Sequence, residues 1–325
     1  MPTGRNAPIN SSRPRAPLAL AMGSFDGVHL GHRQILARTR SLASRLRGLA
    51  GVLTYDPLPA QSIYPDFTYV LTPLAEKTRL LTELGIERIH VVRFNQRVRD
   101  TEPETFVERH VVSGLKPAVV VVGRDHRFGR KGRGDTVLLA HLLEPHGIGL
   151  EVVPEFVLFG GPVRSTRIRE YLLLGNVRRA AELLGRHYAL SGAVVPGTGT
   201  GRRLGFPTIN LRPCERESLV PADGVYACRV DVAERRFDAV VNIGHRPTFG
   251  GETRTIEAHL LGLDEDIRPS NAVFHLIDRM RPERRFPSAE ALAAQIAADV
   301  ARARAALAEP RPATNLDSRI PSNNL

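Results

Sequence analysis

The chain has 325 residues, of which 42% are hydrophobic, and carries a formal net charge of +11. This length suits two domains with ordinary cores, and no apolar run approaches the roughly 18–20 residues that a membrane span needs. Residues 1–15 are polar and lack the apolar core of a secretory signal, so we expect a cytoplasmic protein that does not contact membranes.

Strand-like and helix-like segments alternate over residues 16–185. Apolar strand patterns fall at 17–22, 52–55, 88–94, 118–122 and 150–153, and helical spacing falls at 31–49, 73–84, 103–115 and 136–143. This alternation predicts an α/β domain with a parallel, doubly wound sheet, in which ligands bind beyond the carboxyl ends of the strands. Two more helices are expected at 165–174, after a Ser-Thr cap, and at 176–184, after an Asn cap.

The pattern changes after residue 186. Short strand-like runs at 188–195, 224–232, 237–243, 255–261 and 272–276 are separated by Gly- and Pro-rich turns. They predict a small antiparallel β-barrel, followed by a C-terminal helix over 288–307 that Ser288 caps. We therefore expect a disordered tail over 1–15, a first domain over 16–185, a second domain over 186–308 and a disordered tail over 309–325.

Two histidines follow the first strand at the point where a helix begins. His29 and His32 are three residues apart, so both imidazoles can face one ligand. The helix N-terminus offers free N–H groups and a partial positive charge to a phosphate, and Gly31 lets that phosphate approach the backbone. Two exposed histidines in a loop are an equally good interpretation of these residues alone.

The surrounding residues favour the phosphate site. Residues 23–32 resemble the GxFDGVHxGH form of the HxGH signature in bacterial FAD synthetases, and residues 165–169 resemble the SSTxxR signature of the same nucleotidyltransferases. This resemblance implies the reaction FMN + ATP → FAD + pyrophosphate, with His29 and His32 on the ATP phosphates. It also implies flavin contacts for Asp125 and Phe128, and nucleotide contacts for Gly23, Phe25, Asp26, Gly31, Ser165, Thr166 and Arg169.

Four positions in this half depart from the family pattern. Leu58 replaces a histidine, Arg124 an acidic residue, His126 an aromatic residue and Arg164 a serine. Leucine neither donates a hydrogen bond nor carries charge, so a phosphate contact can be lost at Leu58, for which Arg124 or Arg164 could supply a substitute cation. A riboflavin kinase with a degenerate adenylyltransferase domain is therefore the first alternative.

A second motif lies at the start of the predicted barrel. Gly197, Gly199 and Gly201 alternate with other residues in a loop whose backbone can approach a phosphate closely. The next residues, 203–210, closely resemble the GRxLGFPTxN signature of riboflavin kinases. That resemblance implies that Thr208 and Asn210 contact a divalent metal, expected to be Mg²⁺, and that Asn210 also contacts the nucleotide phosphates.

Glu257 is the expected general base of the kinase reaction. A primary alcohol must attack the γ-phosphate of ATP, and a nearby carboxylate can accept its proton. Strand alternation places Glu257 and His259 on one face, within a segment over 256–260 that matches a further family landmark. A solvated, outward-facing glutamate is the alternative.

The resemblance spans residues 18–307, so we identify the chain as a member of the bifunctional riboflavin kinase/FMN adenylyltransferase family. Riboflavin, FMN and ATP are the substrates that it implies, and the sequence leaves the oligomeric state open. A non-catalytic, nucleic-acid-binding regulator is an alternative because of the net charge. The basic residues are spread along the chain with few aromatics between them, so we expect no nucleic-acid partner.

Overall fold

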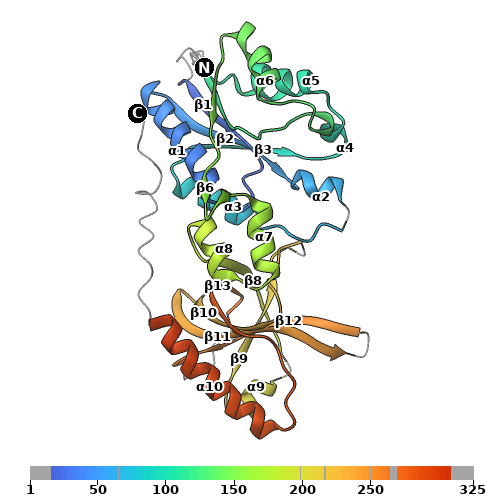
Figure 1. Cartoon of the computed structure of the whole chain (residues 1–325), viewed down its shortest axis with the longest axis vertical. Helices are drawn as coiled ribbons and strands as arrows, with labels where there is room; N and C mark the ends of the chain where they lie inside the picture. The colour runs from blue at the N-terminus through green and yellow to red at the C-terminus, as the bar shows by residue number, and fades with distance from the viewer. Residues whose placement is uncertain are drawn as a thin grey trace, which may run out of the picture.

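The computed structural model describes residues 16–64, 66–197, 199–215, 217–248, 251–263 and 269–308. The two predicted tails lie outside these residues. Figure 1 shows an α/β half above a β-barrel half, with helices α7 (Ser165–Leu173) and α8 (Val177–Leu184) between them. None of the described helices is long and apolar enough to span a membrane.

The first half contains a five-stranded parallel sheet. The strand order is β3-β2-β1-β4-β5, which confirms the predicted doubly wound arrangement. The strands are β1 (Leu18–Met22), β2 (Leu49–Asp56), β3 (Arg88–Arg93), β4 (Val119–Gly123) and β5 (Gly149–Val153). The central strand β1 is buried along its whole length, and separate apolar clusters pack on the two faces of the sheet. Both faces are covered, which explains why these strands read as continuous apolar runs.

The helices of this half match the predicted segments closely. They are α1 (Leu30–Arg45), α3 (Leu74–Glu83), α5 (Pro103–Val107), a π-helix (Glu108–Leu115) and α6 (Thr136–Leu143). The segment predicted as one helix over 103–115 is therefore divided. Short elements that were not predicted are α2 (Pro59–Ile63), α4 (Gln96–Arg99), the 3₁₀-helices at Arg130–Gly132 and Glu144–His146, and the hairpin of β6 (Val157–Leu158) and β7 (Gly161–Pro162).

The predicted cap of α7 is wrong, whereas the cap of α8 is confirmed. Arg164 occupies the N-cap position of α7, without a side-chain cap bond. The hydroxyl of Ser165 instead donates a hydrogen bond of 2.8 Å to the carbonyl of Asp26. The side chain of Asn176 caps α8 by accepting from the N–H of Arg179.

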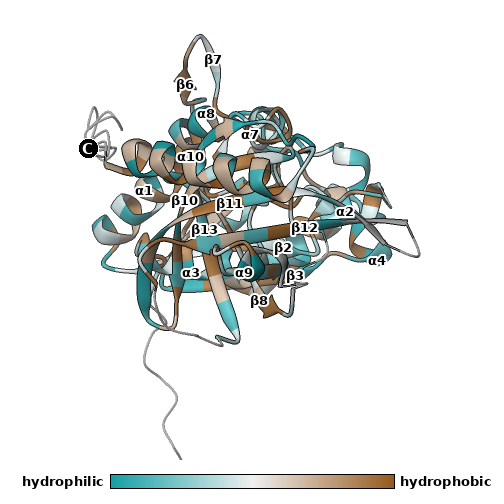
Figure 2. Ribbon diagram, turned by 90° about the horizontal axis from the view of Figure 1, so that it is seen from below, coloured by the Kyte–Doolittle hydropathy of each residue, from teal (hydrophilic) through white to brown (hydrophobic). Residues whose placement is uncertain are grey.

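The second half is a closed antiparallel barrel with the strand order β10-β11-β12-β9-β8-β13. Its elements are β8 (Tyr188–Val195), α9 (Thr200–Arg203), β9 (Thr208–Pro213), β10 (Gly224–Val232), β11 (Arg235–Thr248), β12 (Gly251–Leu260), β13 (Asn271–Arg281) and α10 (Ala289–Ala308). Figure 2 shows α10 lying across the barrel, where it packs on β10, β11 and β13. The barrel and its C-terminal helix confirm the predicted fold class of this half.

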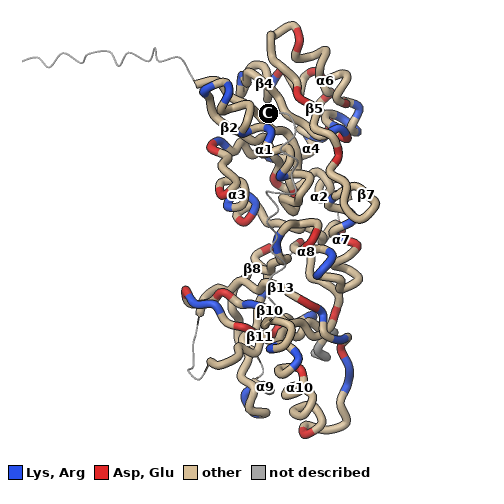
Figure 3. The backbone as a smooth tube through the Cα atoms, turned by 60° about the vertical axis from the view of Figure 1, so that its left-hand side comes forward, with Lys and Arg blue, Asp and Glu red and all other residues tan. Residues whose placement is uncertain are grey.

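The two halves share one apolar core. A single cluster of buried residues includes Leu30 and Ile168 of the first half and Tyr226 and Phe274 of the second. Backbone hydrogen bonds also cross the junction, because Val70 pairs with residues 217 and 219 at 2.9 Å. Figure 3 shows Lys and Arg on elements of both halves, interspersed with Asp and Glu.

Candidate functional sites

A cavity of about 880 Å³ opens beyond the carboxyl ends of β1, β4 and β5. Residues 22–25 follow β1 into its wall, residues 123–129 follow β4, and residues 153–156 follow β5. The N-termini of α1 and α7 meet at the same place, contributing His29, His32, Ser165 and Thr166. The position agrees with the rule for open parallel sheets, in which strand ends and helix N-termini converge on the ligand.

The two histidines form one unit at the start of α1. Their rings stack with centroids 3.6 Å apart and planes 16° apart. His29 is the N-cap residue of α1, and its Nδ1 accepts the backbone N–H of His32 at 3.3 Å. In a neutral imidazole the proton then lies on Nε2, which makes that atom a donor. His32 Nδ1 is buried and has no hydrogen-bond partner among the described residues.

Burial keeps both imidazoles neutral. Burial, followed by the cation of Lys77 and then that of Arg186, lowers the pKa of His32 to about 3. The pKa of His29 is also well below its ordinary value, mainly because of burial and then because of His32 and Arg186. At neutral pH the pair therefore offers N–H donors to an anion without carrying charge itself.

The loop before His29 has a strained backbone. Phe25 and Val28 have positive φ angles of 49° and 40°, which are unusual outside glycine. Asp26 is buried between them, and its carboxylate accepts from the N–H groups of Leu71 and Thr72. Residues with strained backbone angles persist only when the surrounding structure holds them. The hydrogen bonds of Asp26, which lies between Phe25 and Val28, hold this loop.

Asp26 and Arg169 lie together outside the cavity lining. The guanidinium of Arg169 forms an ion pair with the Asp26 carboxylate and donates at 2.8 Å to the carbonyl of Tyr69. The side chains of Arg169 and Asp26 are 17% and 3% exposed. Both residues are predicted to contact nucleotide, and in the structure their side chains bond to each other and to the segment at Tyr69, Leu71 and Thr72 beside the loop that carries His29.

The remaining predicted residues of this half line the cavity: Gly23, Phe25, Gly31, Asp125, Phe128, Ser165 and Thr166. Arg124 and Arg164 also line it, and Arg164 pairs with Glu155 and lies 3.7 Å from Asp125. Leu58 is buried and absent from the cavity lining, although its neighbour Pro59 is part of it. His126 stacks on Phe128, and burial lowers the pKa of His126 to about 4.

Lys77 is a buried residue of this site for which sequence reasoning gave no role. Its ammonium donates to the carbonyls of Ser24 at 3.3 Å and Tyr55 at 3.0 Å, beneath the cavity wall. Two signals in the sequence pointed to it: residues 71–77 lie in the stretch that resembles the family, and Lys77, Lys116 and Lys131 are the three lysines of a chain with 45 lysines and arginines in total.

The second cavity, of about 540 Å³, lies against the barrel. Gly197, Gly199, Thr208 and Asn210 line it. A β-carbon built at Gly197 would lie 2.3 Å from Asn210 Nδ2, and one at Gly201 would lie 3.3 Å from Thr208 Oγ1. Glycine at these two positions therefore lets the loop backbone approach the side chains of Asn210 and Thr208 closely.

Strand pairing places the predicted kinase residues on one face. Glu257 of β12 is paired with Asn210 of β9, and His259 with Thr208, so all four side chains share a face of the barrel wall. Ala258, on the opposite face, belongs to the apolar core, and the partly buried Ile209 packs against that core. Glu257 is half-buried beside Asn210 but is not part of the cavity lining.

The donor set at this face suits a magnesium ion. Among the described residues there is no group of three or more His, Cys, Asp or Glu side chains that could hold a metal. Mg²⁺ in nucleotide sites uses few protein ligands, prefers hard oxygen atoms and keeps waters and phosphate oxygens as its other ligands. The hydroxyl of Thr208 and the amide oxygen of Asn210 fit that chemistry.

The two halves match two family models. The FAD synthetase model matches residues 12–167, and the riboflavin kinase model matches residues 184–307. These matches agree with the order of the two cavities along the chain.

The chain is also similar to curated proteins over most of its length. A bifunctional riboflavin kinase/FMN adenylyltransferase of Pseudomonas fluorescens is 37% identical over 87% of this chain and 91% of that protein. Its counterpart in Escherichia coli is 35% identical over 93% of this chain and 97% of that protein. A solved structure described as a macrolide-efflux protein from Streptococcus pneumoniae has a TM-score of 0.82 and 28% identity, covering 91% of this chain and 96% of its own.

Proposed function

The chain belongs to the bifunctional riboflavin kinase/FMN adenylyltransferase family, and we propose that its two reactions take place in the two cavities described above. The chain phosphorylates riboflavin with ATP to give FMN, and it adenylates FMN with ATP to give FAD and pyrophosphate. The proposal assigns adenylyl transfer to the cavity at His29 and His32, and phosphorylation to the cavity at Thr208 and Asn210.

In adenylyl transfer, a phosphate oxygen of FMN attacks the α-phosphorus of ATP, and pyrophosphate leaves. The FMN phosphate is already ionised at neutral pH, so the step needs no general base. It needs donors where negative charge develops on the α-phosphate and the leaving group. The neutral imidazoles of His29 and His32 and the N-termini of α1 and α7 supply such donors.

In phosphorylation, the terminal hydroxyl of riboflavin attacks the γ-phosphorus of ATP, and ADP leaves. We assign the acceptance of the hydroxyl proton to Glu257, and its pairing on the strand with Asn210, which lines the cavity, supports this role. Thr208 and Asn210 would hold Mg²⁺, which neutralises phosphate charge when bound. The backbone around Gly197 and Gly201 holds the phosphates close to these side chains.

The lining of the first cavity holds more cationic than anionic side chains, although Asp100, Asp125 and Glu155 also line it. Arg99, Arg124, Arg127, Lys131 and Arg164 all line it. Leu58, which stands where the family has a histidine, does not line the cavity. The five cationic side chains of the lining are therefore independent of that substitution. This observation favours an active adenylyltransferase over a kinase with a degenerate first domain. We also propose a cytoplasmic location and no nucleic-acid partner.

Purified protein incubated with ATP and Mg²⁺ tests the assignment. One reaction receives riboflavin, a second receives FMN, and chromatography of the flavins measures both products. We expect FMN and then FAD from riboflavin, and FAD with equimolar pyrophosphate from FMN. FMN formation without FAD in either reaction would refute an active adenylyltransferase.

A further inference from the structure

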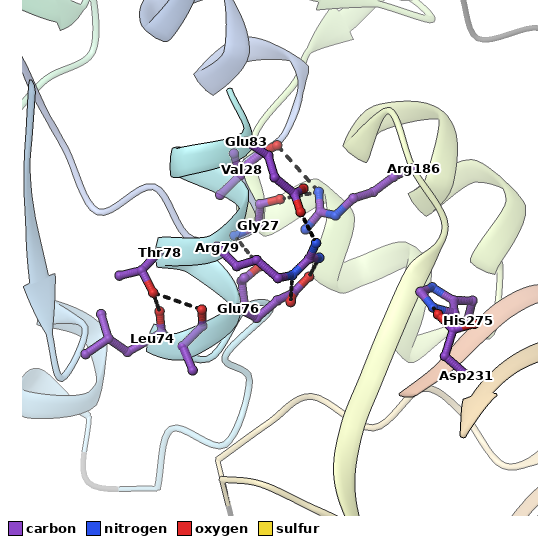
Figure 4. Close-up of polar contacts among 12 residues, drawn as sticks. Gly27, Val28, Leu74, Glu76, Thr78, Arg79, Glu83, Arg186, Asp231 and His275 are labelled. Atoms are coloured by element: carbon purple, nitrogen blue, oxygen red, sulfur yellow. Dashed lines mark hydrogen bonds and ion pairs between the residues drawn. The ribbon is translucent and has the colours of Figure 1, made fainter. Parts of the chain in front are cut away.

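We propose that Arg186, which lies in the kinase half, is a positioning residue for adenylyl transfer in the other half. The riboflavin kinase match begins at residue 184, and the FAD synthetase match ends at residue 167. Figure 4 nevertheless shows the Arg186 side chain reaching the loop at Gly27 and Val28, directly before His29. This inference rests on the proposed placement of adenylyl transfer at His29 and His32.

Arg186 holds the backbone carbonyls of the strained loop. Its Nη1 donates to the Gly27 carbonyl at 2.8 Å and lies 3.5 Å from the Val28 carbonyl. The neighbouring polar groups are held from the first half, since the Gly27 N–H donates to Thr72 Oγ1 and the Asp26 carbonyl accepts from Ser165. Arg186 thus adds a polar contact from the second half to a loop that Thr72 and Ser165 hold from the first.

The placement is costly for an arginine, which favours a specific role. Burial lowers the pKa of Arg186 to about 10, so the guanidinium stays charged at neutral pH. Buried cations usually pair with carboxylates. Here the guanidinium contacts two backbone carbonyls, with Glu76 as an attractive charge nearby and Arg33 and Arg79 as repulsive ones.

The position of the loop controls the position of both imidazoles. Val28 precedes His29, which caps α1 and stacks on His32. A shift of the Val28 carbonyl therefore moves the cap and the paired rings together. Misplacement of catalytic groups by about 1 Å costs on the order of 10²-fold in rate. We expect that loss in adenylyl transfer alone, since the kinase residues lie on β9 and β12.

Three variants test the proposal: Arg186→Ala, Arg186→Lys and the control Arg79→Ala. Arg79 is a neighbouring arginine whose hydrogen bonds run to Glu76 and Glu83 and not to the loop. For each full-length variant, kcat and KM are measured for FAD formation from FMN and for FMN formation from riboflavin. Thermal unfolding of each preparation is followed by circular dichroism.

We expect Arg186→Ala to lower kcat for FAD formation about 10²-fold. Its KM values should change by less than about threefold and its kinase rate by less than about twofold, because the lost contact acts on the imidazoles and not on substrate binding. Arg186→Lys should recover part of kcat, since an ammonium can still donate to a carbonyl. Arg79→Ala should match the wild-type enzyme.

Several results would overturn the proposal. They are an unchanged kcat in Arg186→Ala, an equal fall of both activities together with the melting temperature, or an equal fall in Arg79→Ala. If Arg186→Ala does not fold, a folded Arg186→Lys with equal loss of both activities refutes it as well. A wild-type enzyme that makes no FAD would instead refute the proposed adenylyltransferase site.

Discussion

The buried ion pair between Asp26 and Arg169 should contribute to stability more than any exposed pair on the same protein. Arg169→Ala removes the paired cation and leaves the Asp26 carboxylate 3% exposed, with its bonds to the N–H groups of Leu71 and Thr72 and with the Lys77 cation nearby. Breaking a buried pair in this way costs about 3–5 kcal/mol. For domains of this size each kcal/mol shifts the melting temperature by about 2–4 °C, so we expect a fall of about 6–20 °C.

Differential scanning calorimetry of three variants measures this contribution. Arg79→Ala is the matched control, because Arg79 is 53% exposed and its pairs with Glu76 and Glu83 lie on the surface. Exposed pairs are worth about 0–1 kcal/mol, so its melting temperature should hardly change. The double variant Asp26→Asn/Arg169→Met should regain part of the loss, since no buried charge is left unpaired. Equal melting temperatures for Arg169→Ala and Arg79→Ala would refute a structural role for Arg169.

Three further predictions concern the two centres. Glu257→Gln should lower FMN formation on the order of 10²–10⁴-fold in a kinase assay, and a near-normal rate would remove Glu257 from the role of base. His32→Ala should abolish FAD formation from FMN and spare the kinase, and parallel loss of both rates would contradict the division. The pKa of His32 is about 3 when folded and about 6.5 when unfolded, so the unfolded chain binds the extra proton between these values. The stability that this residue contributes is full above pH 6.5 and is lost as the pH falls, so melting temperatures should drop less between pH 7 and pH 4 in His32→Gln than in wild type.

Local patterns in the sequence predicted the fold and several of the residues that line the two cavities, whereas Asp26, Arg169, Gly201 and Glu257 lie outside both linings. The apolar run over residues 118–122 and the Asn cap at Asn176 depend on neighbours within a few positions, and both were recovered in the structure. Strand alternation and the two motifs predicted which residues share a face within each strand. The structure added the pairing of β9 with β12, which brings Glu257 beside Asn210.

Contacts between distant parts of the chain could not be predicted in the same way. Asp26 and Arg169 are separated by 143 positions, and Arg186 and Gly27 by 159, so no periodicity connects them. Ser165 has the residue type of an N-cap, but its hydroxyl is used by the Asp26 carbonyl, which only the packed structure reveals. The π-helix after Val107 likewise has no short-range signal that separates it from an ordinary helix.

Complementation between two inactive variants tests the existence of two independent centres most directly. His32→Ala retains the kinase residues, and Glu257→Gln retains the adenylyl-transfer residues, so neither variant alone should convert riboflavin to FAD in the presence of ATP and Mg²⁺. A mixture of the two purified variants should produce FAD, because FMN released by the first is a substrate for the second. A mixture that forms no FAD, although His32→Ala still makes FMN, would contradict the assignment of the two reactions to separate cavities.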